Sequence, residues 1–348
     1  MNKDLWKNRD FKVMLLKETD KPFNSKDFIY EIKFDGIRAL IFAGKNEFRI
    51  VSRNGINVTN IFPELTSIKK LCKKNVIFDG EIVSMEKGKI SFSKLSKRMH
   101  LKNKNNIMKE STINPVTFVA FDIIYENKNI TTVELLERKK ILNKYKDTEF
   151  FVKSVCYKDG IKLFDKVKKL GIEGVVAKYI HGEYHINERT DDFIKIKNFK
   201  YGDFFIGGYL ENKNGLSLLL GEYSNGNFIF VGKVSLNKKY SLYERVLKLK
   251  KSKNYFCNLS DDAFYVKPSI KCKVQYLEKT ENNSLRQPIL KERDWWVWMN
   301  IIVKEILVLQ MNLLEKQIRL IRRGYLPCNI IIQEENIMIL DFCIIKNL

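Results

Sequence analysis

The sequence predicts an α+β protein with two domains and a tail of a different kind. Its 348 residues exceed the usual length of one domain. Runs typical of β-strands alternate with helical stretches up to about residue 200, and further β-type runs with one helical stretch continue to about residue 290. We therefore predict domains over residues 1–200 and 201–290 and a separate tail over residues 291–348.

In the first domain, runs of apolar and β-branched residues predict strands, and helically spaced apolar residues predict helices. The predicted strands are Phe28–Phe34, Ala39–Phe42, Phe48–Val51, Val76–Val83, Val116–Tyr125 and Gly174–Lys178. The predicted helices are Glu64–Lys73, Val133–Tyr145 and Gly160–Leu170. A linker is expected at Asn198–Asp203.

The second domain has the pattern of a small β-barrel. The predicted strands are Phe204–Leu210, Leu216–Tyr223, Phe228–Val234, Phe264–Lys267 and Cys272–Thr280, with one helix at Leu242–Lys250. The turn Ser224–Asn227 reads Ser-Asn-Gly-Asn, which is a strong hairpin signal because Asn and Gly tolerate positive φ. Several strands with one helix in about 85 residues suit a barrel of the OB type.

The charge of the chain indicates a polyanionic partner. Lys and Arg number 63 against 41 acidic residues, a net charge of +22. Residues 1–294 hold 57 of the basic and 36 of the acidic residues, so the excess belongs to the two domains. Nucleic acid is the partner that such an excess favours. No basic amphipathic helix stands out, so we expect no membrane partner.

Composition excludes several other classes of protein. Hydrophobic residues make up 45% of the chain, which excludes disorder for most of it. The six cysteines stand singly and form no CxxC pair, so neither a zinc site nor a disulfide framework is expected. The first ten residues are charged and carry no apolar leader, which predicts a cytoplasmic protein.

The segment Glu31–Arg38 carries the sharpest chemical signal. It reads Glu-Ile-Lys-Phe-Asp-Gly-Ile-Arg, so Lys33 is flanked by acids two residues away on each side and followed by a glycine turn. An amine is a nucleophile only when deprotonated, so a catalytic lysine needs partial burial or nearby positive charge. Alone, this pattern is also compatible with a surface lysine at a strand end.

Further motifs follow in a fixed order. They are Ser52–Gly55 (SRNG), Phe78–Glu81 (FDGE), Phe118–Tyr125 (FVAFDIIY), Glu173–Lys178 (EGVVAK) and Phe193–Lys197 (FIKIK). With the lysine segment, this set resembles that of the ATP-dependent DNA ligases, within the covalent nucleotidyltransferase superfamily, over about residues 20–290. The resemblance implies a nucleotidyltransferase (ATP-grasp-like) adenylation domain followed by an OB-fold domain, similar to a minimal bacterial or end-joining-type ligase core.

The resemblance assigns roles to the first motifs. Lys33 would attack the α-phosphorus of ATP and form a phosphoramidate. Asp35 would orient the lysine amine or cap the turn. Glu31 resembles the residue beside the adenine, and Arg38 and Arg53 resemble residues that contact the nucleotide and the nick phosphate.

The later motifs would complete the site. Glu81 resembles the ligand of the ribose hydroxyls and a second metal ligand, and Glu173 resembles the carboxylate that holds Mg²⁺ or Mn²⁺. Phe121 stands where the family stacks an aromatic ring on adenine, although its apolar neighbours also fit a core residue. Lys195 and Lys197 alternate on a predicted strand and so share a face, where they would meet the triphosphate.

The chain departs from the family pattern after residue 288. Leu285–Pro288 (LRQP) resembles the end of the OB domain, and the family then has a basic-acidic-lysine motif that contacts the outer phosphates of ATP. Here Arg293 and Asp294 match its first part, but Trp295 replaces the lysine. Three of the four tryptophans also fall at residues 295–298. The residues from about 292 onward are therefore either a frameshifted translation or a divergent helical extension.

The implied function is nick sealing in duplex DNA by a monomeric enzyme that uses ATP and Mg²⁺ or Mn²⁺. Binding would be independent of sequence, since nicks occur anywhere, and would rest on phosphate contacts. An RNA ligase, a GTP-using capping guanylyltransferase and a catalytically impaired nick-binding protein are the alternatives. The resemblance implies a place in the bacterial cytosol or nucleoid, and leaves open replication, repair or end joining and any protein partners.

Overall fold

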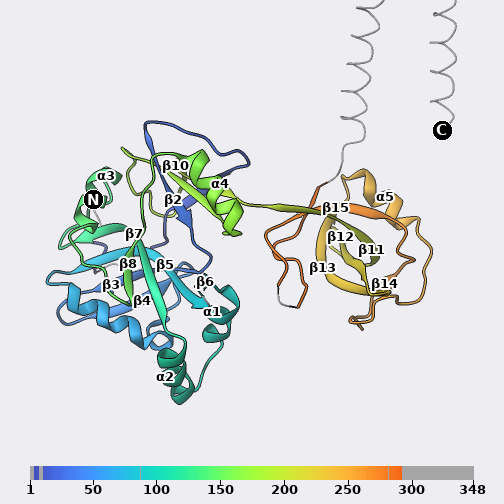
Figure 1. Ribbon diagram of the computed structural model, residues 1–348, viewed down its shortest axis with the longest axis horizontal. Coiled ribbons are helices and arrows are strands. Elements are labelled where there is room, and N and C mark those ends of the chain that lie inside the picture. The colour runs from blue at the N-terminus through green and yellow to red at the C-terminus, as the bar shows by residue number, and fades with distance from the viewer. Residues whose placement is uncertain (1–3, 8–10, 87, 281, 292–348) are drawn as a thin grey trace, which may run out of the picture. The chain divides into compact units, whose positions relative to one another are not determined.

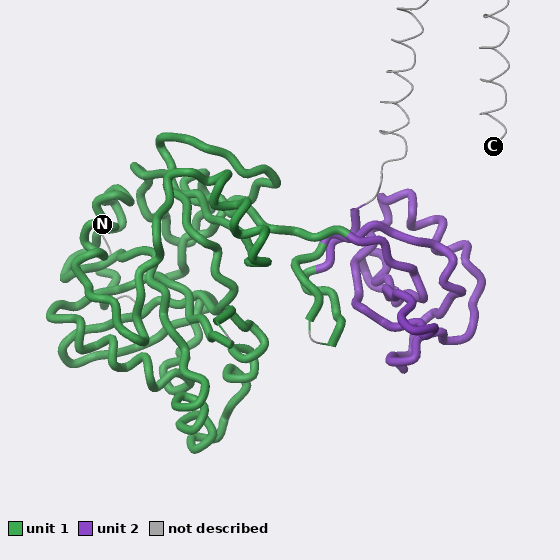
Figure 2. Tube along the Cα trace, viewed as in Figure 1, with its two compact units in different colours: residues 1–201, 276–287 green, residues 202–275, 288–348 purple. Residues whose placement is uncertain are grey.

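The computed structural model describes residues 4–7, 11–86, 88–280 and 282–291 (Figure 1). The chain forms two compact units, coloured separately in Figure 2. Unit 1 comprises residues 1–201 and 276–287, and unit 2 comprises residues 202–275 and 288–348. Apart from Lys291, the predicted tail lies outside the described residues, and so does the choice between frameshift and helical extension. The domain limits at 200 and 290 stay a prediction.

Unit 1 is built on two β-sheets. One sheet has the order β1 (Leu15–Thr19), β10 (Arg189–Lys197), β9 (Gly174–Tyr179) and β2 (Phe28–Lys33). The other has the order β4 (Phe48–Ser52), β3 (Ile37–Ala43), β5 (Val76–Glu86), β7 (Val116–Glu126) and β8 (Phe151–Lys153), with β6 (Lys89–Ile90) paired to β5. The pairs β1–β10 and β7–β8 are parallel, and the other pairs are antiparallel.

The alternation of side chains along the strands separates the hydrophobic cores. On β3, Leu40 and Phe42 join one cluster, which also holds Phe193 of the four-stranded sheet. Ile41, between them, joins the cluster on the opposite face of the larger sheet. Leu163 and Val167, on the helix α4 (Gly160–Leu170), cover the outer face of the four-stranded sheet. The two sheets therefore share one core and each has a second, separate core.

The helices of unit 1 differ in part from the sequence prediction. Helix α4 has the predicted bounds, because the Asp159 side chain caps its start and Gly171, with φ of 68°, ends it. The predicted helix at 64–73 is the 3-10 helix η2 (Pro63–Leu71), preceded by η1 (Thr59–Ile61), and the predicted helix at 133–145 is the shorter α3 (Leu135–Leu142). The helices α1 (Phe92–Met99) and α2 (Lys104–Ile113) were not predicted.

Unit 2 is a β-sheet with one helix. Its strand order is β13 (Asn227–Asn237), β12 (Gly215–Ser224), β11 (Lys200–Asn212), β15 (Lys271–Tyr276) and β16 (Ile289–Lys291), with β14 (Phe264–Tyr265) paired to β11 and helix α5 (Ser241–Leu247) after β13. Asn225 and Gly226 have φ of 48° and 77°, as the predicted hairpin requires. Among the described residues the ladder is open, since no pairing joins β13 to β16.

One boundary prediction was wrong. The expected linker at Asn198–Asp203 is largely strand, because β11 begins at Lys200 and continues to Asn212. Glycine and charge at 200–203 gave the appearance of a loop, but extended backbone accepts both at a strand end. None of the helices in the described part of the chain is long and apolar enough to cross a membrane.

Candidate active site

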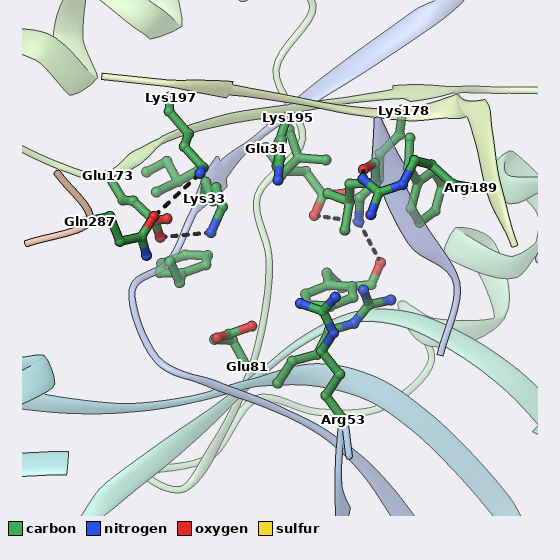
Figure 3. A pocket seen from close by; sticks show the side chains of 17 residues that line it. Glu31, Lys33, Arg53, Glu81, Glu173, Lys178, Arg189, Lys195, Lys197 and Gln287 are labelled. Atoms are coloured by element: carbon green, nitrogen blue, oxygen red, sulfur yellow. Dashed lines mark hydrogen bonds and ion pairs between the residues drawn. The ribbon is translucent and has the colours of Figure 1, made fainter. Parts of the chain in front are cut away.

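A cavity of about 350 Å³ in unit 1 gathers most of the residues that the motifs singled out (Figure 3). Side chains from β2, β9 and β10 line one side, and side chains from β3, β5 and β7 line the other. The predicted site residues that line it are Glu31, Lys33, Arg38, Arg53, Glu81, Phe121, Glu173, Lys195 and Lys197. Leu16, Ile32, Phe34, Val176, Lys178, Arg189, Phe193 and Gln287 complete the lining.

Lys33 and Glu173 form an ion pair in the cavity. The Lys33 Nζ lies 2.7 Å from a Glu173 carboxylate oxygen, and Figure 3 shows the two side chains pointing toward each other. The antiparallel register explains the contact, because Lys33 at the end of β2 lies opposite Gly174 at the start of β9. Burial raises the pKa of Glu173 even though the Lys33 ammonium opposes this shift.

Glu81 is a second carboxylate of the cavity, on β5. Its strand neighbour is Arg38 on β3. Burial raises the pKa of Glu81 to about 8, against the opposing effects of Lys33 and Arg38. The turn between Lys33 and β3 passes close to Glu81, and Gly36 makes this approach possible. A Cβ at position 36 would collide with the Ile82 carbonyl oxygen and lie 2.8 Å from the Glu81 Cγ.

Asp35 contacts an arginine and lies outside the cavity lining. Its carboxylate pairs with both terminal nitrogens of Arg286, with 2.7 Å between Arg286 Nη2 and Asp35 Oδ1. Arg286 also donates to Glu278 at 3.1 Å. The two predicted roles of Asp35, orienting the lysine amine or capping the turn, stay a prediction; in the structure the Lys33 amine bonds Glu173 and Asp35 bonds Arg286.

Glu31 lines the cavity and is buried in a cluster of charges. It forms ion pairs with Lys139 and Lys178, the latter at 3.1 Å. Burial opposes ionisation of Glu31, but the two lysines outweigh it and lower the pKa of the carboxyl. The Lys178 Nζ lies 4.3 Å from the centre of the Phe121 ring and 4.9 Å from that of Phe193. Lys178 closes the EGVVAK motif, which was its only signal in the sequence.

The two arginines of the early motifs have different surroundings. Arg38 donates twice to Asp79, at 2.7 and 3.1 Å, and once to the Met14 carbonyl at 2.7 Å. Its guanidinium is buried and lies 5.4 Å from the Phe121 ring centre. Arg53 is exposed and lines the cavity. Of the two, Arg53 is therefore the freer to meet a ligand phosphate.

Lys195 and Lys197 both line the cavity, as their alternation on β10 predicts. Their ammonium groups share the carboxylate of Glu18, at 2.9 and 3.7 Å respectively. Lys197 also donates to the Gln287 side chain at 3.4 Å. Burial and the neighbouring Lys195 charge lower the pKa of Lys197. The sequence gave no signal for Glu18, and Gln287 stands in the LRQP segment, which was matched to the end of the OB domain and not to the site.

The cavity has the charge pattern of a site for an anionic ligand. Seven basic side chains and three acidic ones line it. In the described residues no group of three or more His, Cys, Asp and Glu side chains is arranged to hold a metal ion. The predicted nucleotide-binding residue Arg293 lies outside the described residues.

Family models match both units of the chain. The model described as ATP dependent DNA ligase domain matches residues 12–197, and the one described as ATP dependent DNA ligase C terminal region matches residues 212–294. The first match alone covers more than half of the chain. The chain therefore belongs to the ATP-dependent DNA ligases, and it uses ATP. RNA ligase and capping chemistry are not favoured.

Curated relatives include proteins of two sizes. The SPbeta prophage-derived DNA ligase-like protein LigB of Bacillus subtilis (strain 168) is 29% identical over 79% of this chain and 96% of its own length. The bifunctional non-homologous end joining protein LigD of the same organism is 27% identical over 74% of this chain, but over only 45% of its own length. The chain thus spans less than half of that larger relative.

Solved structures confirm the fold. Mycobacterial DNA ligase D, complexed with ATP and MES, is 26% identical, with a TM-score of 0.51 over 82% of this chain and 96% of that chain. A Lig E DNA ligase, described as DNA binding with a minimal scaffold, superposes with a TM-score of 0.56 over 81% of this chain and 98% of that chain, at 17% identity. The predicted class, a nucleotidyltransferase domain with an OB-type domain, is therefore confirmed.

Proposed function

We propose that the protein seals nicks in duplex DNA through an adenylylated Lys33. The observation that carries this proposal is the Lys33–Glu173 ion pair inside a cavity with seven basic side chains. The Lys33 nitrogen attacks the α-phosphorus of ATP, the bond from that phosphorus to the bridging oxygen of the β-phosphate breaks, and pyrophosphate leaves with the electron pair. The amine loses a proton, for which Glu173, 2.7 Å away and with a raised pKa, is the nearest acceptor.

Two further transfers complete the reaction. An oxygen of the 5′-phosphate at the nick attacks the phosphorus of the lysyl-AMP, the phosphorus–nitrogen bond breaks, and Lys33 recovers its amine. The 3′-hydroxyl then attacks the activated 5′-phosphate, forms the phosphodiester and releases AMP. Dividing the synthesis in this way stores the energy of ATP on the enzyme.

The nucleoside is proposed to bind between the two sheets. Phe121 offers a ring face for the adenine, and Glu31, held ionised by its lysines, offers an acceptor to the base. Glu81, which lines the same cavity, would bond the ribose hydroxyls. The Phe121 ring also forms a cation–π contact with the Lys178 ammonium.

The phosphates are proposed to lie along the basic side chains. Lys195 and Lys197 face the cavity and would bind the outer phosphates, with Arg53 as a further contact. Arg38 is committed to Asp79 and the Met14 carbonyl, so we assign it the positioning of the Phe121 face. Asp35 holds the turn after Lys33.

The carboxylates of Glu81 and Glu173 fit a divalent cation. Burial raises the pKa of both, so each is stabilised by a cation that replaces its proton. Mg²⁺ needs few protein ligands when substrate phosphates supply the others. When bound, Mg²⁺ or Mn²⁺ would offset the charge of the triphosphate.

The whole chain is proposed to act as a minimal ligase. We assign residues 1–200 to the adenylation domain and 201–290 to the OB-fold domain, supported by the two family matches. The charge of +22 suits sequence-independent DNA binding that weakens steeply with salt. The relative named for non-homologous end joining favours a repair role. A monomer in the bacterial cytosol or nucleoid, with any repair partners, belongs to the same proposal.

The test is covalent labelling with each α-labelled nucleoside triphosphate and Mg²⁺. Label from ATP alone, absent in Lys33→Ala and retained in the surface variant Lys17→Ala, is the expected result. Label from GTP would contradict the proposal. If no label forms but a nick that already carries 5′-adenylate is sealed, only the first step is impaired; failure of both reactions would leave the nick-binding alternative.

A further inference from the structure

Glu18 lies against Lys195 and Lys197, two lysines of the cavity lining, and has no part in the chemistry above. Its strand β1 runs parallel to β10, and Glu18 pairs with Lys195 in the register. The register shifts between Leu16 and Lys17, where Leu16 pairs with Thr190 but Lys17 pairs with Ile194. This irregularity brings the acidic residue to the level of Lys195 and Lys197.

The Glu18 carboxylate interacts with both lysines. It lies 2.9 Å from the Lys195 Nζ and 3.7 Å from the Lys197 Nζ. The Glu18 side chain is 35% exposed, more than those of Lys195 (22%) and Lys197 (12%). The cations are thus fixed in the wall, while the acid lies at its edge. The two ammonium groups lower the pKa of Glu18 against a partial burial, so the carboxylate is charged when the site works.

We propose that Glu18 is a counterion that weakens the hold of Lys195 and Lys197 on pyrophosphate and so favours the release of this product. The inference rests on the proposed adenylylation of Lys33. Pyrophosphate must leave once the bond to the α-phosphorus is broken, and two unopposed ammonium groups on one face would retain it. A carboxylate that shares those cations repels the product's charge and lowers its affinity.

The same repulsion acts on the β- and γ-phosphates of ATP. Glu18 therefore lowers the affinity for ATP and, by the same repulsion, speeds the release of pyrophosphate. Binding that is equally strong before and after the chemical step gives no rate gain, and strong product binding slows turnover. A residue that merely held the lysines in place would have the opposite effect, since its loss would weaken phosphate binding. The sign of the change distinguishes the two roles.

The experiment uses the full chain with Glu18→Gln, which removes the charge and keeps the shape. The adenylylated enzyme is mixed with pyrophosphate, and the concentration that gives half-maximal loss of label is measured, along with the KM for ATP in label formation. We expect Glu18→Gln to lower both by about three- to tenfold, the range expected for one charge at the edge of a half-buried site. The effect should shrink at high salt.

Asp191→Asn is the matched control. Asp191 pairs with Lys17 at 2.7 Å on the same two strands, but its side chain is 75% exposed and its partner Lys17 does not line the cavity. Both variants gain one net positive charge, so an equal response would overturn the proposal in favour of a general charge effect. Glu18→Ala, which also lacks the charge, should change both constants in the same direction as Glu18→Gln.

The remaining outcomes are separable. Unchanged or raised pyrophosphate constants in both Glu18 variants, with normal labelling in the unmodified protein, would refute the counterion role and leave adenylylation standing. Absence of label in the unmodified protein would refute the proposed function itself.

Discussion

Arg286 and Asp35, 251 residues apart in the chain, are joined by a two-pronged ion pair. Arg286 belongs to the segment 276–287, which packs with unit 1 although the residues on either side of it belong to unit 2. Its guanidinium also lies 4.2 Å from the centre of the Phe92 ring. The pair therefore ties this returning segment to the turn that follows Lys33.

Replacing Arg286 by Lys is expected to slow the labelling of Lys33 by about tenfold. An ammonium cannot reproduce the fork that bonds both oxygens of Asp35, so the turn loses its anchor. The rate of label formation under single-turnover conditions measures the effect. Lys233→Ala is the control, because Lys233 forms an exposed ion pair with Asp261 in unit 2 and should label at the normal rate. A normal rate in Arg286→Lys would show that the pair has no bearing on the lysine.

Glu173→Gln is expected to reduce the rate of label formation by about 10²-fold. Glutamine keeps the size of the side chain but cannot accept the proton of the Lys33 amine or hold a cation as strongly. Glu134→Gln, which removes an exposed acid paired with His181, should leave the rate within twofold. An equal loss in both variants would point to a general charge effect.

The titration of Glu81 predicts how stability depends on pH. Its pKa rises from 4.5 to about 8 on folding, so between these values the unfolded chain binds fewer protons at this site than the folded protein. The stabilising contribution of the protonated carboxyl is complete below pH 4.5 and is lost as pH rises through 8. Glu81→Gln should remove this loss, a difference of about 1–3 kcal/mol between pH 5 and pH 9. Urea unfolding of both proteins at the two pH values measures it, and parallel pH profiles would contradict the assignment.

Arg98 is expected to be among the costliest residues to remove. It is fully buried and bonds Glu64 at 2.6 Å, the Ile61 carbonyl at 2.7 Å and the Asn114 carbonyl at 3.0 Å. Arg98→Ala leaves Glu64 buried without its partner, which costs about 3–5 kcal/mol. Urea unfolding should show this loss, whereas Lys97→Ala, on the exposed face of α1, should change stability by less than about 0.5 kcal/mol.

Local signals in the sequence predicted the elements that depend on local physics. The hairpin at Asn225 and Gly226 was predictable because positive φ selects those residue types. The bounds of α4 were predictable from its cap, its apolar spacing and its closing glycine. Helices α1 and α2 were not, since only Leu95 and Ile107 are buried apolar residues on them and the apolar spacing is lost.

The motifs predicted which residues line the cavity but not their partners. Asp35 pairs with Arg286 because the chain returns to unit 1, which places Arg286 beside it 251 residues later. Glu18 pairs with Lys195 because of the register between their two strands. Sequence spacing carries no information on such pairs. Likewise, the segment Glu31–Arg38 did not predict that the Arg38 guanidinium would donate its hydrogen bonds to Asp79 and the Met14 carbonyl.

Gly36 has a consequence for how the site meets its nucleotide. Because the turn after Lys33 fits against β5 only without a side chain, folding itself fixes the spacing between the nucleophile and Glu81. The entropic cost of bringing these groups together is part of folding, so it does not reduce the affinity for ATP. Gly36 therefore helps to preorganise the site before the substrate binds, and this position should tolerate no replacement even though Gly36 does not line the cavity.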